Sequence, residues 1–421
     1  MKIAILGGGF TGLAAAYRLL KLGHNVTIIE KQPDLGGLAV GFREKNWDWS
    51  LEKAYHHWFT NDEFILNLAR EINHKVIITR PQTAVLVKDQ LFPFDSPLAL
   101  LKFSPLPLLD RLRIGLVLAF LRFTNNYHQF ENIPALSWLR RWMGSKSVDL
   151  IWEPLFIGKF GDYKEEITLS WFWARIKKRT SSLAYPEGGF KVFIDHLGEE
   201  VRKLGGEILV DTEVTEISST ETNVTVKSLE KTYQFDKLIS TLPSPIFTKI
   251  TPDLPKNYAT RINSIPHLWA QNLILVLDKP FFKEKIYWLN ITEKNWPFLV
   301  LNEHTNFIES KHYHNKHIVY IGNYLPQGHL FIKLTKEELL KKFEPYLRKL
   351  STSYQQPVTS HLFTAPFAQP VVTIDYHKKI PGFVSPLKNI YIANMDMVYP
   401  WDRGTNYAVE LGYKVADMIE N

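Results

Sequence analysis

The chain has 421 residues, 45% of them hydrophobic and 22% charged, which is typical of a globular protein and too long for a single core. Its net charge of +7 is spread along the sequence, so the concentrated basic stripe that nucleic-acid binding requires is not indicated. The absence of cysteine excludes disulfides, thiolate metal sites and cysteine nucleophiles.

The N-terminal stretch KIAILGGGFTGLAAAYRLLKLGHNVTIIE predicts a buried strand, a glycine turn, an amphipathic helix and a second strand. Gly7, Gly9 and Gly12 have G-x-G-x-x-G spacing, which allows a tight turn, close approach of a pyrophosphate and packing of helix on strand. Backbone N–H groups at the helix start, at Phe10 and Thr11, would face the phosphates. This unit predicts a dinucleotide site.

Glu30 ends the second strand, eighteen residues after Gly12, where an acid can bind ribose hydroxyls. Its charge disfavours a 2′-phosphate, so NADP is not expected, and Lys31 beside it is a further candidate for the site. The next segment, DLGGLAVGF, contains a second Gly-Gly pair. Gly37 in that pair is predicted to allow another close backbone approach to a cofactor.

The cluster YHHWFTND (residues 55–62) places His56 and His57 among three aromatic residues. Imidazole titrates near neutral pH, so either histidine is a candidate for proton transfer. The alternative is that both histidines pack and form hydrogen bonds in a domain interface.

Residues 91–123 are apolar with interleaved Arg and Lys. We favour a buried helical hairpin with charged ends, and a peripheral membrane-contact surface is the alternative. The longest apolar run, IGLVLAFL, is too short to span a bilayer, and the N-terminus reads as a strand rather than a signal peptide. We therefore expect a cytoplasmic protein, either free or peripheral to the inner face of the membrane.

Residues 153–179 combine Lys159 and Arg175 with dense aromatics. These two cations could bind a phosphate or carboxylate of a substrate, or they could be solvated charges on a helix pair. Tyr324, a polar position within a strand-like run, is a further candidate for lining a substrate pocket. The sequence has neither a Ser/His/Asp triad nor an H-E-x-x-H motif, so no metal site is predicted.

The motifs together resemble the FAD-dependent amine oxidase and protoporphyrinogen oxidase superfamily, which includes phytoene desaturases and UDP-galactopyranose mutases. The resemblance rests on the N-terminal fingerprint, the second Gly-Gly, the segment 183–217 and the closing stretch NIYIANMDMVYPWDRGTNYAVELGYKVADMI. It implies FAD as the cofactor, which we expect to be non-covalent; attachment through a cysteine is impossible in this chain, and attachment through a histidine is the alternative. Leu38 stands where the family usually has an arginine, so an arginine contact to the cofactor is absent there.

The same resemblance implies roles for residues later in the chain. The backbone of Val214 would meet the adenine, and Asp396 would contact the ribityl-phosphate region. The last helix would point its N-terminus at the flavin, with Arg403 as a candidate catalytic residue beside it. The backbone donors at this helix start would be Gly404, Thr405 and Asn406.

The predicted fold is α/β, a Rossmann-like (GR2-type) FAD-binding domain with an inserted mixed-sheet and helical substrate domain. We assign residues 1–80, 181–245 and 386–421 to the FAD-binding domain and residues 81–180 and 246–385 to the substrate domain. The predicted activity is hydride transfer between an apolar, isoprenoid or porphyrinogen-like small molecule and flavin N5. A mutase-like isomerase acting on a nucleotide sugar is the alternative, and a flavin-free binding protein is a third. The oligomeric state is open.

Overall fold

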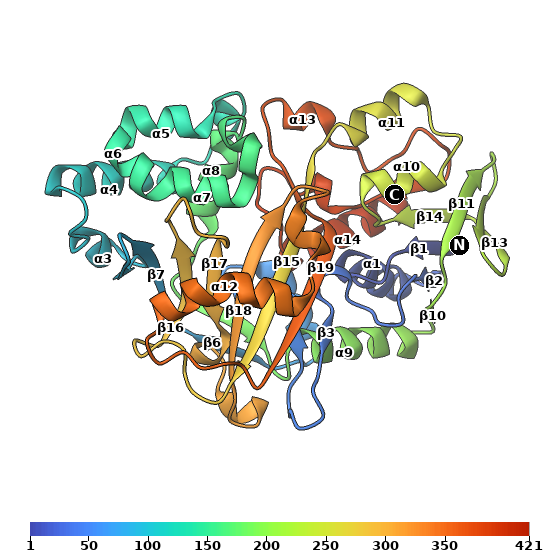
Figure 1. Ribbon diagram of the computed structural model, residues 1–421. Coiled ribbons are helices and arrows are strands. Elements are labelled where there is room, and N and C mark those ends of the chain that lie inside the picture. Colours follow the sequence, from blue (N-terminus) through green and yellow to red (C-terminus); the bar gives the residue numbers. More distant parts are fainter. Residues whose placement is uncertain (421) are drawn as a thin grey trace.

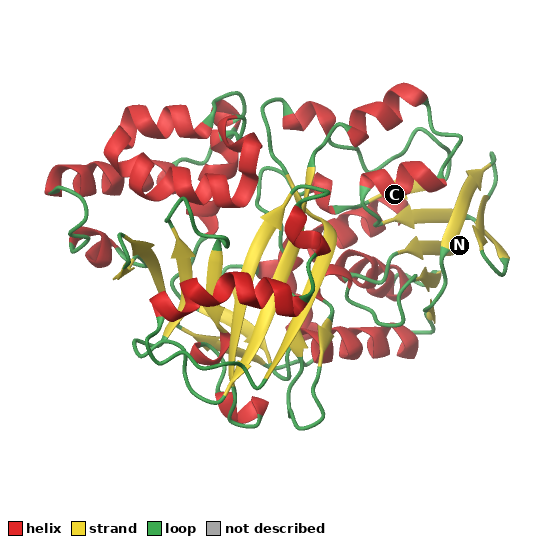
Figure 2. Cartoon of the chain, in the orientation of Figure 1, coloured by secondary structure: helices red, strands yellow, loops and turns green. Residues whose placement is uncertain are grey.

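The computed structural model describes residues 1–420 and confirms an α/β fold in which helices surround two large sheets (Figures 1 and 2). The first sheet is parallel, with strand order β10-β2-β1-β14-β20. Its strands are almost entirely apolar at their centres because helices cover both faces. The strands are β1 (Lys2–Leu6), β2 (Asn25–Ile29), β10 (Glu207–Leu209), β14 (Lys237–Ser240) and β20 (Ile390–Ile392).

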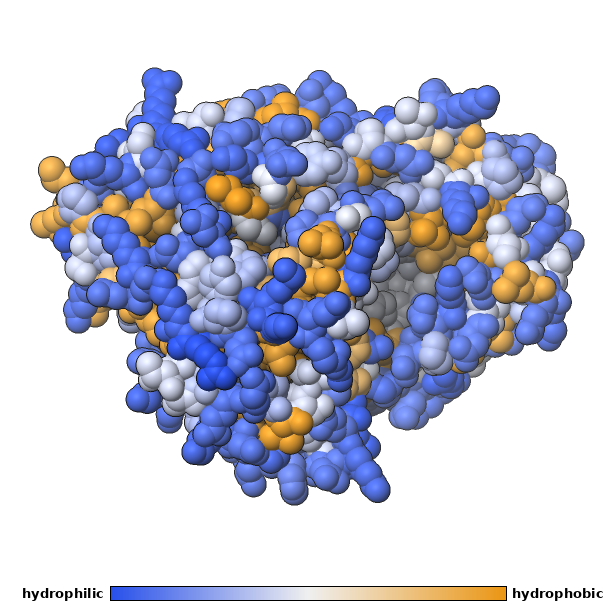
Figure 3. Space-filling model, in the orientation of Figure 1, coloured by the Kyte–Doolittle hydropathy of each residue, from blue (hydrophilic) through white to orange (hydrophobic). Residues whose placement is uncertain are grey.

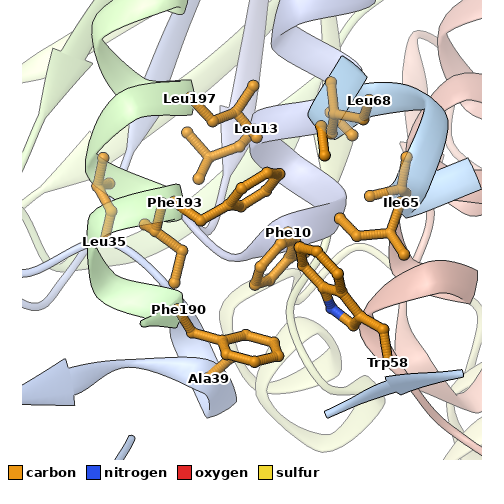
Figure 4. Packing of buried hydrophobic residues seen from close by; sticks show 14 of the residues in the cluster. Phe10, Leu13, Leu35, Ala39, Trp58, Ile65, Leu68, Phe190, Phe193 and Leu197 are labelled. Carbon is orange, nitrogen blue, oxygen red and sulfur yellow. The ribbon is translucent and has the colours of Figure 1, made fainter. Parts of the chain in front are cut away.

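The glycine turn places helix α1 (Phe10–Lys21) directly after β1. A Cβ atom on Gly12 would lie only 2.0 Å from the carbonyl oxygen of Gly7, so the turn requires glycine at this position. One face of α1 packs against helices α2 (Glu63–Glu71) and α9 (Phe190–Lys203) through a buried apolar cluster (Figure 4).

The last helix, α14 (Thr405–Glu420), packs against α1, so elements from the two ends of the described chain lie side by side. Gly412 makes this approach close, since a Cβ atom there would lie 2.5 Å from the carbonyl oxygen of Thr11. Arg18 and Asp417 add an ion pair of 2.8 Å between the two helices. The starts of both helices are thereby fixed relative to one another.

The second sheet is mixed and has seven strands in the order β19-β15-β18-β17-β16-β7-β8. Helix α12 (Lys336–Leu350) packs on one face through a cluster that includes Leu339 and Phe343. The strands are β7 (Gln82–Val87), β8 (Gln90–Pro93), β15 (His267–Leu277), β16 (Ile286–Ile291), β17 (Val300–Glu303), β18 (His317–Leu325) and β19 (Thr359–Pro370).

A helical region follows β8, and its core also includes Val85 and Val87 of β7 and Leu268 of β15. Its helices are α3 (Pro97–Leu101), α4 (Leu108–Phe123), α5 (Ala135–Met143), α6 (Ser145–Ser147), α7 (Glu153–Phe160) and α8 (Leu169–Lys178). Smaller elements complete the chain: β3 (Gly41–Phe42), β4 (Leu51–Glu52), β5 (Trp58–Phe59), β6 (Val76–Thr79), β9 (Leu183–Pro186), β11 (Val214–Ser219), β12 (Val224–Ser228), β13 (Thr232–Phe235) and α13 (Tyr376–Lys379).

Two helices follow β14, close to the predicted domain boundary at residue 246. Helices α10 (Ser244–Ile250) and α11 (Lys256–Asn263) pack with the parallel sheet. Phe247 and Ile262 share a buried cluster with Leu238 of β14. The chain then enters the second sheet at β15, and the domain division stays a prediction.

Helix α4 is apolar on two faces, and the favoured prediction of a buried hairpin holds for only one of them. Ile114 and Leu121 are fully buried, whereas Leu116 is 72% and Phe120 50% exposed. The exposed apolar face at the edge of the molecule (Figures 1 and 3) consists of Leu98, Leu101, Leu108, Leu109, Leu112, Leu116, Phe120, Phe123 and Trp142. Within residues 1–420, no helix combines the length and the hydropathy needed to cross a bilayer.

Candidate active site

The glycine turn at the start of α1 has the form of an anion cradle. Gly9 is the N-cap residue of α1, no side chain caps the helix, and its first turn has no acidic residue. The Phe10 side chain lies in the core against Phe190 and Phe193, so only its backbone can face the turn (Figure 4). The first N–H groups of a helix have no partner within it, which leaves them available to a ligand.

The backbone angles of Gly9 and the space beside it indicate whether a phosphate fits this cradle. Its φ of −80° and ψ of −177° are extended values that any residue adopts. A Cβ atom there would meet nothing closer than 3.8 Å, the Cα of Gly37 across the cradle. Neither backbone strain nor packing of the protein therefore requires glycine at this position. Space kept clear beside helix N–H groups fits a bound diphosphate.

Glu30 lies directly at the turn. Its carboxylate accepts hydrogen bonds from the N–H of Gly8 at 2.7 Å and of Gln32 at 2.8 Å. A carboxylate has about four lone-pair sites, so capacity remains for ribose hydroxyls. The carbonyl of Glu30 accepts from the N–H of Thr212, which brings Val214, at the start of β11, to the same edge of the sheet.

Three other predicted positions lie around this cradle. Gly37 and Leu38 are exposed in a short 3-10 turn, and the N–H of Gly36 donates to the carbonyl of Gly8 at 2.9 Å. Lys31 is also exposed and pairs with Glu213 at 2.7 Å. The structure therefore gives Lys31 a surface ion pair, while Gly37 faces Gly9 directly.

The start of α14 is tied by one hydrogen bond to β5 and by another to α2. The indole N–H of the fully buried Trp58 donates to Thr405 Oγ1 at 2.8 Å, and the Asn406 side-chain oxygen accepts from the N–H of Ile65 at 3.2 Å. Both polar side chains are thus used inside the protein, which leaves their backbone groups for a ligand. Gly404, just before them, is exposed.

Asp396 is buried between β15 and α10. Its side chain is 1% exposed, and one carboxylate oxygen lies 2.6 Å from His267 Nε2. The other accepts from the hydroxyl of Ser244 at 2.5 Å. These contacts link β15 to α10, and the contact of Asp396 with the ribityl-phosphate region stays a prediction.

His56 packs against Phe190 of α9, and His57 packs against Tyr287 and Trp288 of β16. His56 Nδ1 is 2.7 Å from the carbonyl of Ala54, and His57 Nδ1 is 3.1 Å from the hydroxyl of Tyr287. Burial lowers the pKa of His56 to about 4 and that of His57 to about 3. Both imidazoles are therefore neutral at pH 7, which makes them hydrogen-bonding groups and weak bases.

Arg403, the residue before Gly404, links the segment before α14 to the seven-stranded sheet. Arg403 donates a hydrogen bond from Nη2 to the hydroxyl of Tyr324 on β18. Burial and the neighbouring Tyr324 raise the pKa of Tyr55 well above its usual value, so the Tyr55 phenol stays neutral. The ring of Tyr55 packs edge-on against Trp288 at 5.0 Å. The Arg403 guanidinium lies over the Tyr324 ring, 4.9 Å from its centroid.

Asp402 is the residue that sequence reasoning missed. Its carboxylate lies 3.3 Å from Lys159 Nζ on α7 and 2.5 Å from Arg175 Nη1 on α8, and it accepts a hydrogen bond from the Trp171 indole at 3.1 Å. Burial alone would raise the pKa of Asp402, but Lys159, Arg175 and Arg403 bring it well below its usual range.

The predicted substrate residues therefore do converge. Lys159, Arg175 and Tyr324 come from three separate elements, and they meet Asp402 and Arg403 immediately before α14. Lys159 Nζ also lies 5.0 Å from the centroid of the Trp171 ring. The arrangement can bind a flat or apolar body against aromatic rings and a negative group against cations.

Comparison with known proteins identifies relatives along the whole chain. A family model described as flavin containing amine oxidoreductase matches residues 10–419. Flavin-containing amine oxidase B of Canis lupus familiaris is 23% identical over 456 residues, covering 99% of this chain and 85% of that protein. A 54-residue segment is 60% identical to 4,4'-diapophytoene desaturase (4,4'-diaponeurosporene-forming) of Staphylococcus aureus strain MRSA252, covering 13% of this chain and 11% of the desaturase.

Solved structures agree with the fold. A candidate protoporphyrinogen oxidase from Exiguobacterium sp. 255-15 superposes with a TM-score of 0.80 at 17% identity, covering 100% of this chain and 98% of that one. Reduced UDP-galactopyranose mutase gives a TM-score of 0.77 at 16% identity, covering 100% and 95%. At such identities these structures establish the fold and leave the substrate open.

Proposed function

The chain belongs to the family of flavin-containing amine oxidoreductases and is a flavin-dependent oxidoreductase, and on that premise we propose that its substrate is an apolar molecule of the isoprenoid or porphyrinogen type. The cofactor is FAD. When bound, FAD supplies the acceptor for a hydride taken from a C–H bond of the substrate.

We assign the glycine cradle to the diphosphate of FAD. Support comes from Gly9, whose missing side chain is required by neither backbone conformation nor packing. Glu30 would bind ribose hydroxyls, and Val214 would lie beside the adenine. The start of α14, at Gly404, Thr405 and Asn406, would direct the positive end of a helix dipole at the ring, where it favours negative charge.

The observation that carries the apolar substrate is the aromatic enclosure before α14. Tyr55, Trp171, Trp288, Tyr324 and Trp401 come from different segments. Trp171 contacts Asp402, Tyr324 contacts Arg403 and Trp401 stacks on Tyr407, while Tyr55 packs against Trp288. Such side chains orient flat or branched apolar ligands and exclude water. The neutral His56 and His57 would hold hydrogen bonds without adding charge to this region.

The test is anaerobic mixing of the purified holoprotein with a panel of prenols, carotenoid precursors, porphyrinogens and amines. We expect prenol-like or porphyrinogen-like compounds to bleach the oxidised flavin and amines to leave it unchanged. Reduction by amines alone would contradict the apolar substrate. A panel in which nothing reduces the flavin would contradict the redox proposal.

A second candidate is an isomerase that acts on a nucleotide sugar, as the name of the galactopyranose mutase states for that protein. The observation that favours it is the group of cations around Asp402, which suits a diphosphate. This candidate requires turnover of a sugar nucleotide only after the flavin has been reduced, with no net change in flavin redox state. Steady oxygen consumption with substrate would exclude it.

We also propose that the protein contacts anionic membranes at the inner, cytoplasmic face, through the exposed apolar face on α3, α4 and α5. Nine large apolar side chains would enter the lipid. Exposed cations border them, which matches the charge of anionic head groups. These cations are Lys102, Arg113, Arg122, Arg141 and Lys146.

A further inference from the structure

The cations around Asp402 exceed the negative charge available to them. Lys159, Arg175 and Arg403 share this one carboxylate, an excess of two positive charges at the start of α14. Within the part of the chain that the structure describes, Lys159 and Arg175 have no other carboxylate within ion-pair distance. Lys159 is 9% exposed, so water provides little compensation for its charge.

Arg403 shows the same deficit at a single atom. Its Nη2 donates to Tyr324, but its Nε is buried without a hydrogen-bond partner in the protein. A buried, unpaired donor on a charged group is costly, and native proteins rarely keep one without a reason. Burial, together with Arg175 and Arg403, also lowers the pKa of Lys159 well below its usual value, although Asp402 opposes this. Besides burial, two cations and one carboxylate therefore act on Lys159.

A second ionic group, at the start of α7, shows how the same protein balances a structural network. Glu153 there is bonded by Arg140 and Lys164 at 3.0 and 2.7 Å. Those cations also reach Asp149 and Glu165, within 3.5 to 3.8 Å. Negative charge is thus distributed among the cations of that group. The excess of positive charge around Asp402 is not found in this second ionic group.

We propose, building on the proposed function, that the substrate carries an oxyanion, a carboxylate or a phosphate, which Lys159, Arg175 and Arg403 bind beside Asp402. The substrate is then amphiphilic, with an apolar body against the aromatic rings and a negative group against these cations. Asp402 orders two of the cations and limits their repulsion before the ligand arrives. Arg403 supplies the unpaired Nε donor and is the cation adjacent in sequence to the start of α14.

The test is calorimetric titration of the FAD-loaded protein with pyrophosphate and, separately, with octanoate, with uncharged octanol as reference. We expect one of the two anions to bind in the millimolar range or tighter. Lys159→Met should weaken that binding by about tenfold or more, because a charge-assisted contact is lost. Lys177→Met on the same helix as Arg175 is the control and should bind as the parent does, since Lys177 bonds to Asn125 and to a carbonyl.

Asp402 remains paired with Arg175 in the Lys159→Met variant, and Arg403→Gln provides a second variant in case the first does not fold. Tight pyrophosphate binding identifies a phosphate, and tight octanoate binding identifies a carboxylate. Failure of both anions to bind the parent protein, or equal binding by all variants, overturns the proposal. Because no turnover is measured, anion binding without flavin reduction would refute only the redox function. Flavin reduction by uncharged substrates without anion binding would refute only this inference.

Discussion

Replacing Gly9 with valine separates cofactor binding from folding. The backbone at Gly9 is extended, and a Cβ atom would have 3.8 Å of clearance from the nearest protein atom. The free energy of unfolding of the apoprotein should therefore change by less than about 1 kcal/mol. Valine lowers the conformational entropy of the unfolded chain, and this stabilisation roughly offsets the poorer helix cap. FAD retention, in contrast, should be lost.

The size of that loss follows from the contacts that the side chain would block. Each charge-assisted hydrogen bond from a backbone N–H to a phosphate contributes about 1.5–3 kcal/mol. Displacing the diphosphate from two such donors would weaken FAD binding by roughly 10²–10⁴-fold. The purified Gly9→Val protein should be colourless.

Gly12→Ala is the matched control three residues away. Its Cβ atom would lie 2.0 Å from the carbonyl oxygen of Gly7, so this variant should destabilise the apoprotein by at least about 1–3 kcal/mol. Urea unfolding of the apoproteins and the flavin-to-protein absorbance ratio measure the two effects. A yellow Gly9→Val protein with normal FAD content would refute the cradle assignment.

Three further predictions concern the membrane face, a buried acid and the loop contact of α14. Leu116→Ser with Phe120→Ser should reduce co-sedimentation with anionic vesicles, while Leu229→Ser, at a site 75% exposed in the β12–β13 turn, should not; equal sedimentation would refute the membrane face. Burial raises the pKa of Glu52 to about 7, above its unfolded value, so stability should fall as pH rises from about 4.5 to 7. Glu52→Gln should remove about 3 kcal/mol of that fall, and an unchanged pH profile of urea unfolding would contradict this origin. Thr405→Val leaves a buried indole N–H without its acceptor and should cost about 1–3 kcal/mol, whereas a loss below about 0.5 kcal/mol would show that the bond is dispensable.

The features that sequence reasoning located best depend on local chemistry. The turn from β1 into α1 needs glycine at position 12 because of a contact only five residues away, so its spacing can be read directly. The start of α14 has a comparable local signal in its glycine and polar residues. In the structure, a helix begins at each of these two positions, α1 after β1 and α14 after β20.

The features that were missed depend on contacts between distant segments. Asp402 was not among the predicted site residues, because its partners Lys159 and Arg175 are 243 and 227 positions away and leave no local signal. Helix α10 buries Phe247 in one cluster with Ile390 of β20, a contact that the residues around α10 do not reveal. The stripe of α4 that stays exposed could not be distinguished by sequence from the stripe that is covered, since both are apolar.

The pairing of α1 with α14 has a consequence for how the protein is made. The ion pair between these helices joins residues 399 positions apart, so a ribosome must release nearly all of the chain described here before the two helices can meet. Until α14 has been synthesised, α1 and its glycine turn lack the helix that packs against them. FAD should therefore bind late, after α1 and α14 have packed together.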